Sequence, residues 1–109
     1  MNWYKLDDNN NVVKCLSVSE FNEWHDTISD EVKTGLGLTV ASWGGDPKYV
    51  STVFLGGCSG SQKNDPMVFE TTVFSEEGEE DCRTYATWDE AVAGHQDIVS
   101  EIAKQRIER

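Results

Sequence analysis

The 109-residue sequence has few basic side chains and no long apolar run. Nine Lys and Arg stand against 20 Asp and Glu, giving a formal net charge of -11 at pH 7. Sequence-independent affinity for DNA or RNA comes from cations that neutralise phosphates, so we expect no direct nucleic-acid binding. An anionic membrane surface is disfavoured for the same reason. Apolar runs of at most two or three residues predict neither a signal peptide nor a membrane span.

Cysteine and histidine are too sparse to predict a metal site or a disulfide framework. Cys15, Cys58 and Cys82 are far apart and lack C-x-x-C spacing, and the two histidines are His25 and His95. Structural zinc sites usually take closely spaced pairs of ligands. Free thiols fit a reducing cytoplasm. We therefore expect a cytoplasmic protein without a metal ion or a cofactor.

The composition nevertheless supplies the core of one domain, residues 1–109. Hydrophobic residues make up 38% of the chain and aromatic residues 10%, which a disordered chain would lack. Near the N-terminus, residues 2–6 and 12–15 have the pattern of short strands around the Asp/Asn-rich turn 7–11. A Ser-x-x-Glu capping box at Ser17 then predicts a short helix over residues 18–28.

The central part of the sequence predicts antiparallel strands. Apolar and polar residues alternate over residues 36–43, 48–55 and 67–74, and a glycine- and proline-containing turn at 44–47 separates the first two. A further strand through residues 83–86 would join the same sheet.

A longer helix closes the predicted fold. Thr87 and Glu90 repeat the capping-box spacing, and apolar residues follow a helical period from Ala91 to Ile102. The expected fold class is α+β, with a single antiparallel β-sheet and both a short N-terminal helix and a longer C-terminal helix packed on it.

The loop 56–66 is one candidate binding surface, because hairpin loops usually need about two to five residues. Its glycines, serines and lysine could present hydrogen-bond donors to an anion, although the spacing of a P-loop is absent. The alternative is a solvated loop without a ligand. Together with aromatic side chains, this loop could hold a nucleotide through a set of candidate ligand-binding residues: Trp43, Gly57, Ser59, Lys63, Glu70, Tyr85, Trp88 and His95.

An enzyme would have to use either Cys58 or His95. Cys58 would require a neighbouring base and an electropositive setting, and an ordinary thiol is the simpler interpretation. His95 falls on the apolar stripe of the C-terminal helix, where a hydrogen-bonded histidine at the edge of the core is the simpler interpretation. If Glu70, Tyr85 and His95 converge, they form a polar pocket between sheet and helix. We expect no catalytic residues and no enzyme activity.

The second candidate surface is the acidic segment 75–82. Repulsion among its carboxylates predicts an exposed turn, and the D-x-D-x-D-G spacing of a calcium loop is missing. The segment is either a solvated hairpin tip or, with Asp89, Glu90, Asp97 and Glu101, a negative face for a basic partner. The candidate partner-binding residues are Glu76, Glu77, Glu79, Glu80 and Asp81.

Four segments in this order resemble a family of small uncharacterised bacteriophage proteins. These are residues 3–7 (WYKLD), 50–56 (VSTVFLG), 69–71 (FET) and 85–95 (YATWDEAVAGH). In that family a Leu-Asp-His-like stretch usually follows the central glycine, where this chain has Gly57-Cys58-Ser59. The resemblance implies a phage origin and action in the cytoplasm of an infected bacterial host, and it implies no particular activity or ligand.

The sequence thus favours a non-enzymatic phage accessory protein. It would antagonise a host process, such as antiviral defence, by binding a host protein with a basic surface. The alternative is a small-molecule binder that sequesters a nucleotide signal with the 56–66 loop. Unpaired sheet edges also leave a homo-oligomer open.

Overall fold

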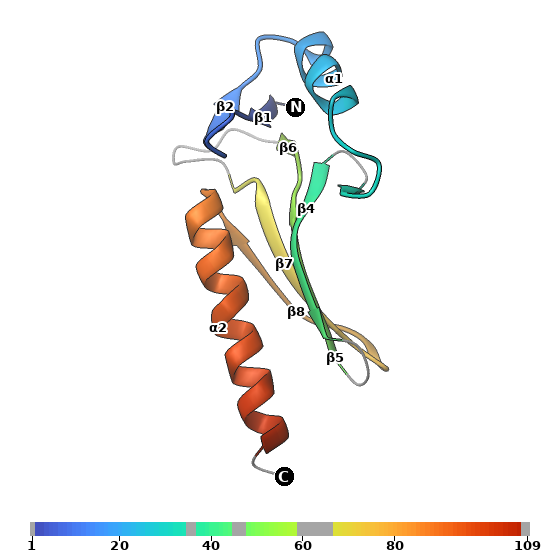
Figure 1. Cartoon of the computed structure of the whole chain (residues 1–109), viewed down its shortest axis with the longest axis vertical. Coiled ribbons are helices and arrows are strands. Elements are labelled where there is room, and N and C mark those ends of the chain that lie inside the picture. Colours follow the sequence, from blue (N-terminus) through green and yellow to red (C-terminus); the bar gives the residue numbers. More distant parts are fainter. Residues whose placement is uncertain (1, 35–36, 45–47, 59–66, 108–109) are drawn as a thin grey trace.

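The computed structural model describes residues 2–34, 37–44, 48–58 and 67–107, and it shows an α+β fold (Figure 1). The elements of the described residues are β1 (Asn2–Leu6), β2 (Val12–Lys14), α1 (Val18–Asp26), β3 (Lys33–Thr34), β4 (Gly37–Gly44), β5 (Lys48–Phe54), β6 (Gly57–Cys58), β7 (Phe69–Ser75), β8 (Gly78–Tyr85) and α2 (Trp88–Ile107).

The described strands form two sheets, which corrects the expectation of a single sheet. The larger sheet has five strands in the order β3-β4-β5-β7-β8, and the smaller has three in the order β2-β1-β6. All neighbouring strands run antiparallel. The chain leaves the larger sheet after β5 at Gly56, whose φ of 75° lies in the region that glycine favours. Beyond this bend, β6 pairs with β1 instead of continuing β5.

The predicted N-terminal hairpin is confirmed, and the first capping box forms in part, because the glutamate bonds the amide before the capping serine instead of the serine's own. Ser17 Oγ accepts a hydrogen bond from the Glu20 amide at 3.2 Å, and Glu20 Oε1 accepts one from the Leu16 amide at 3.2 Å. The helix ends at Asp26, two residues before the predicted end, where the Thr27 hydroxyl donates to the Trp24 carbonyl oxygen at 2.6 Å.

Helix α1 packs mainly on the smaller sheet and touches the larger one through its Trp24 ring, which is a second correction. Phe21 is 1% exposed, and its ring centroid lies 4.8 Å from that of Trp3 in β1. Lys5 Nζ in β1 lies 3.0 Å from Glu20 Oε2 in α1. The smaller sheet and α1 therefore form one end of the molecule (Figure 1).

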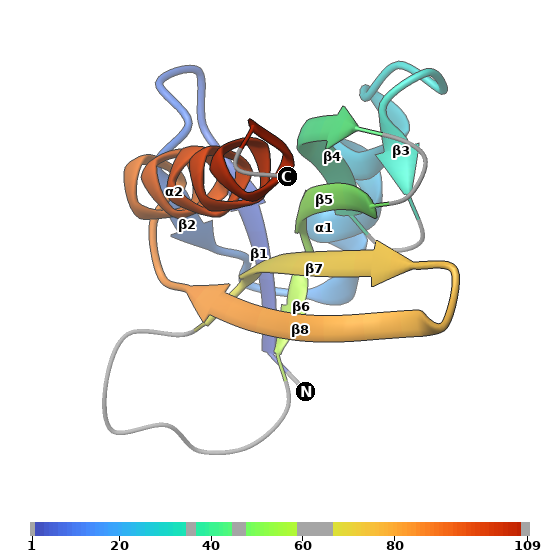
Figure 2. The same ribbon diagram turned by 90° about the horizontal axis from the view of Figure 1, so that it is seen from below.

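Helix α2 lies along one face of the larger sheet (Figure 2). Its residues Ala91, Ile98 and Ile102 are buried there, against strands that contribute Val50 and Phe69. Successive residues of a strand point to opposite faces, so alternate residues of β5 and β7 lie under the helix.

The molecule is elongated, with extents of 51 × 32 × 27 Å and a radius of gyration of 15.0 Å. A compact chain of this length has a radius of gyration of about 13 Å. The β7–β8 hairpin and the last turns of α2 form the end opposite α1 (Figure 1). None of the helices in the described part of the chain combines the length and apolarity of a membrane span.

Candidate functional site

The acidic segment lies on an exposed strand. In the order of the larger sheet, β8 has β7 on one side and no described strand on the other. Every residue from Gly78 to Thr84 is exposed. Only Glu76 and Glu77 form the turn between β7 and β8, whereas Glu79, Glu80 and Asp81 belong to β8. The predicted exposed turn over 75–82 is thus mostly a strand at the edge of the sheet.

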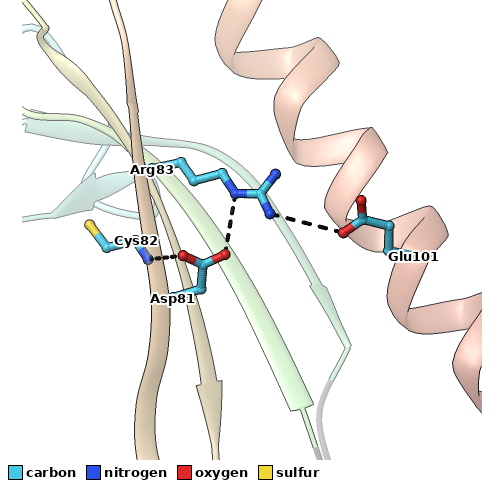
Figure 3. Close-up of polar contacts among 4 residues, drawn as sticks. All are labelled: Asp81, Cys82, Arg83 and Glu101. Atoms are coloured by element: carbon cyan, nitrogen blue, oxygen red, sulfur yellow. Dashed lines mark hydrogen bonds and ion pairs between the residues drawn. The ribbon is translucent and has the colours of Figure 1, made fainter.

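Two of these carboxylates make ion pairs within the molecule. Arg83 lies between strand and helix, with its Nε 3.2 Å from Asp81 Oδ2 and its Nη2 4.0 Å from Glu101 Oε2 in α2 (Figure 3). Lys48 Nζ in β5 lies 3.1 Å from Glu80 Oε2. The side chains are between about a third and two thirds exposed, so each pair contributes at most about 1 kcal/mol.

A stripe of α2 continues this negative charge beside β8. Glu90, Gly94, Asp97 and Glu101 follow each other at helical spacing and so share one side of the helix. That side faces β8, because the Tyr85 ring packs directly against Gly94 and Arg83 reaches Glu101.

We call the combined surface the acidic face. It consists of Glu76, Glu77, Glu79, Glu80 and Asp81 from the β7–β8 hairpin, with Glu90, Asp97 and Glu101 from α2. Within it, Glu79 lies opposite Phe74 and points to the side of the sheet away from α2. Residues 76–101 hold nine carboxylates and one arginine, so this quarter of the chain carries -8 of the net charge of -11. Asp89, which the sequence placed with this group, lies off the stripe and lines a cavity at the start of α2.

His95 belongs to a buried chain of hydrogen bonds. Its Nδ1 lies 2.8 Å from Thr52 Oγ1, which lies 2.6 Å from Thr71 Oγ1. Both threonines are fully buried and His95 is 6% exposed. Burial lowers the pKa of His95 below its usual value, so the ring is neutral at pH 7.

The polar pocket of Glu70, Tyr85 and His95 does not form. Thr71 points toward His95, so its neighbour Glu70 points to the opposite face of the sheet. There Glu70 Oε1 accepts a hydrogen bond from the Thr72 hydroxyl at 3.2 Å. Thr52 and His95 have the spacing of a nucleophile and a base, but complete burial of Thr52 closes it to a substrate.

The described members of the remaining predicted ligand-binding set do not form one site. Trp43 packs with the Val50 cluster of the core, and Trp88 packs with the Phe69 cluster. Gly57 forms part of β6, while Ser59 and Lys63 lie outside the described residues. The side chain of Cys58 also lies outside them.

Neither of the two thiols that the structure describes is activated. Cys15 is buried, and desolvation raises the pKa of its thiol. Cys82 is exposed on β8 and points away from α2 (Figure 3). Desolvation, followed by the charge of Glu70, raises the pKa of the Cys82 thiol. Reactive cysteines need the opposite shift. Within the described ranges no group of His, Cys, Asp and Glu could hold a metal ion.

Sequence reasoning missed a cavity of about 430 Å³ between the N-terminal hairpin and the start of α2. Tyr4, residues 9–12 and Lys14 line it from the hairpin, and residues 86–89 line it from the helix. These segments are more than 70 positions apart in the sequence and carry no shared motif. The one sequence feature that could indicate this cavity is the run of three asparagines, and that run by itself predicts only a turn.

Comparisons with protein-family models, with curated proteins and with solved structures found no match to this chain.

Proposed function

We propose that this protein is a non-enzymatic binding protein whose acidic face docks on a basic protein surface. The observation that carries the proposal is the exposure of β8, a strand with no described strand on its outer side and three consecutive carboxylates. An exposed strand edge can pair with a strand of another protein, and the negative charge of this edge favours a partner with a basic surface.

The charge distribution supports the choice of partner. Outside residues 76–101, the other 83 residues carry a net charge of only -3. The negative field therefore comes mainly from the β7–β8 hairpin and the neighbouring stripe of α2. Such a field attracts a basic surface and repels acidic ones, and it acts over about 8–10 Å at physiological salt.

Three hairpin carboxylates of the acidic face are available to a partner. Glu76, Glu77 and Glu79 are exposed and form no ion pair with any described residue. Glu80 and Asp81, by contrast, hold Lys48 and Arg83. We assign the first contact with a basic partner to Glu76, Glu77 and Glu79.

The resemblance to small phage proteins suggests where this binding takes place. In that setting the protein acts in the cytoplasm of an infected bacterium and blocks a host protein, such as a component of antiviral defence. A basic surface that normally binds nucleic acid is a suitable target, because an acidic face competes with phosphates for the same cations.

The test uses a variant that removes charge and leaves the internal ion pairs in place. Glu76→Gln, Glu77→Gln and Glu79→Gln together neutralise three carboxylates. The matched control removes the same number of negative charges from α1 and the turn after it, with Glu23→Gln, Asp26→Asn and Glu31→Gln. These three side chains are exposed and form no ion pair with a described residue.

Both variants and the natural chain are used as bait in bacterial lysate at about 50 mM and 300 mM salt. The proposal expects a partner with a basic patch that is captured at the lower salt by the natural chain and the control, and poorly by the β7–β8 variant. Equal capture by all three baits, or capture that is insensitive to salt, contradicts it.

A charged edge strand also keeps a protein from pairing with itself, and the same variants separate the two roles. If the carboxylates serve only this purpose, the β7–β8 variant self-associates and no partner is lost. Size-exclusion chromatography of the purified variants shows which of the two occurs.

A further inference from the structure

The cavity at the start of α2 joins two rigid parts of the chain. On the hairpin side, the Asp7 carboxylate accepts hydrogen bonds from the amides of Asn9 and Asn11 at 2.8 and 2.9 Å. The side-chain amide of Asn11 donates to the same carboxylate at 3.3 Å. Asn10 takes a φ of 63°, which asparagine tolerates better than most residues. The turn is thereby fixed without any ligand.

On the helix side, a capping box fixes the lining. Thr87 Oγ1 accepts from the Glu90 amide at 3.1 Å, and the Thr87 hydroxyl donates to Glu90 Oε1 at 3.0 Å. Trp88 is half-buried, with its ring edge-on to Phe69 at 6.2 Å. A volume of about 430 Å³ is within the range of small-molecule sites, about 300–1,000 Å³. Preformed walls of this kind lower the entropy cost of binding.

The lining combines two aromatic rings with side chains that both donate and accept hydrogen bonds. Tyr4 and Trp88 supply the rings. The side-chain amides of Asn9 and Asn10 make no hydrogen bond to any described residue, so they are available to a ligand. An amide offers two donors and one acceptor group, which matches a hydroxyl that is itself donor and acceptor.

Charge decides between neutral and anionic ligands. Lys14 is the one cation among the described residues that line the cavity, and Asp89 lines it from the start of α2. Asp89 offsets the charge of Lys14, so the lining has no net positive charge that would attract a phosphate. We propose that this cavity binds a neutral, hydroxyl-rich ring compound, a monosaccharide or disaccharide, with its apolar ring face on Tyr4 or Trp88 and its hydroxyls on Asn9 and Asn10.

The site binds the sugar and does not cleave it. Glycoside hydrolysis normally takes two carboxyl groups on either side of the scissile bond. Asp89 is the single carboxylate among the lining residues that the structure describes. This binding is independent of the acidic face, because the cavity shares no residue with it.

The experiment is a titration followed by ¹⁵N-¹H correlation spectra of the whole protein. The probes are glucose, galactose, N-acetylglucosamine and maltose, each to about 10 mM, a range that detects dissociation constants near 1 mM. Inorganic phosphate and AMP are the anionic probes. At least one sugar is expected to shift the amide signals of Asn9, Asn10 and Trp88. No shift with any of the four sugars, or shifts with AMP or phosphate alone, overturns the proposal.

Two variants and a control place the sugar in the cavity. Asn9→Ala removes a side-chain amide that forms no described hydrogen bond. Asn10→Gly removes the second such side-chain amide and puts glycine, which tolerates positive φ, at that position. Each variant should bind about three- to tenfold more weakly. Asn22→Ala, an exposed asparagine on α1, should bind like the natural chain. Unchanged affinity in the Asn9→Ala/Asn10→Gly double variant overturns the proposal.

Discussion

Replacing Thr52 by valine should destabilise the fold far more than the same change at Thr71. Thr52 is the middle member of the buried chain, and its hydroxyl bonds both Thr71 Oγ1 at 2.6 Å and His95 Nδ1 at 2.8 Å. Valine keeps the branched shape but removes the hydroxyl, so Thr52→Val leaves two buried polar groups without a partner. Each such group costs about 1–3 kcal/mol, so we expect a loss of about 2–6 kcal/mol.

Thr71→Val removes the end of the chain instead of its middle. Thr52 then keeps His95 as a partner, and no buried polar group loses its last hydrogen bond. The expected loss is about 0.5–1.5 kcal/mol, the net value of one hydrogen bond. Thr71 is therefore the matched control for Thr52, since both are fully buried threonines on neighbouring strands.

Urea unfolding at pH 7.5, followed by tryptophan fluorescence, measures both losses. A result in which Thr52→Val costs no more than Thr71→Val would refute the reasoning, because the two substitutions remove the same atoms and differ only in the partners left behind. The double variant should cost less than the sum of the two single variants, since with both hydroxyls gone only His95 lacks a partner.

Three further predictions concern pH and packing. Burial lowers the pKa of His95, so as the pH falls the histidine of the unfolded chain is protonated before that of the folded chain. The free energy of unfolding should therefore fall as the pH drops below 6.5, and it should level off below the pKa of the folded state. Urea titrations between pH 7.5 and 5 should show a smaller decline for His95→Gln. Hydrogen bonds from the amides of Asn11 and then Asn9 lower the pKa of Asp7, so Asp7→Asn should lower the melting temperature at pH 7, with a difference from the natural chain that shrinks as pH falls below 3.8. A Cβ on Gly37 would collide with the backbone carbonyl of Phe54, so Gly37→Ala should lower the free energy of unfolding by about 3 kcal/mol in the same urea assay. An unchanged urea midpoint would contradict the close approach of β4 and β5.

The local parts of the fold could be predicted from the sequence. Both helix caps form, because the serine or threonine side chain accepts a hydrogen bond from the amide only three residues later. The opening hairpin forms for a similar reason, since its turn is held by side chains within it.

The missed parts depend on contacts between distant residues. β6 has only two residues and exists because β1, more than 50 positions earlier, pairs with it. Repulsion among the carboxylates indicated a turn over 75–82, but an edge strand exposes its side chains to water and can carry the same charges. The partners of His95 come from β5 and β7, and no spacing in the sequence links them.

The central claim, docking through the acidic face, is tested most directly by the dissociation constant of the purified complex as a function of salt. We expect the affinity of the natural chain to fall steeply between about 50 and 300 mM salt. The variant Glu76→Gln/Glu77→Gln/Glu79→Gln should bind about tenfold more weakly at the lower salt, at about 0.5 kcal/mol for each charge, and should show a shallower dependence. Identical salt curves for the natural chain and this variant would contradict the account.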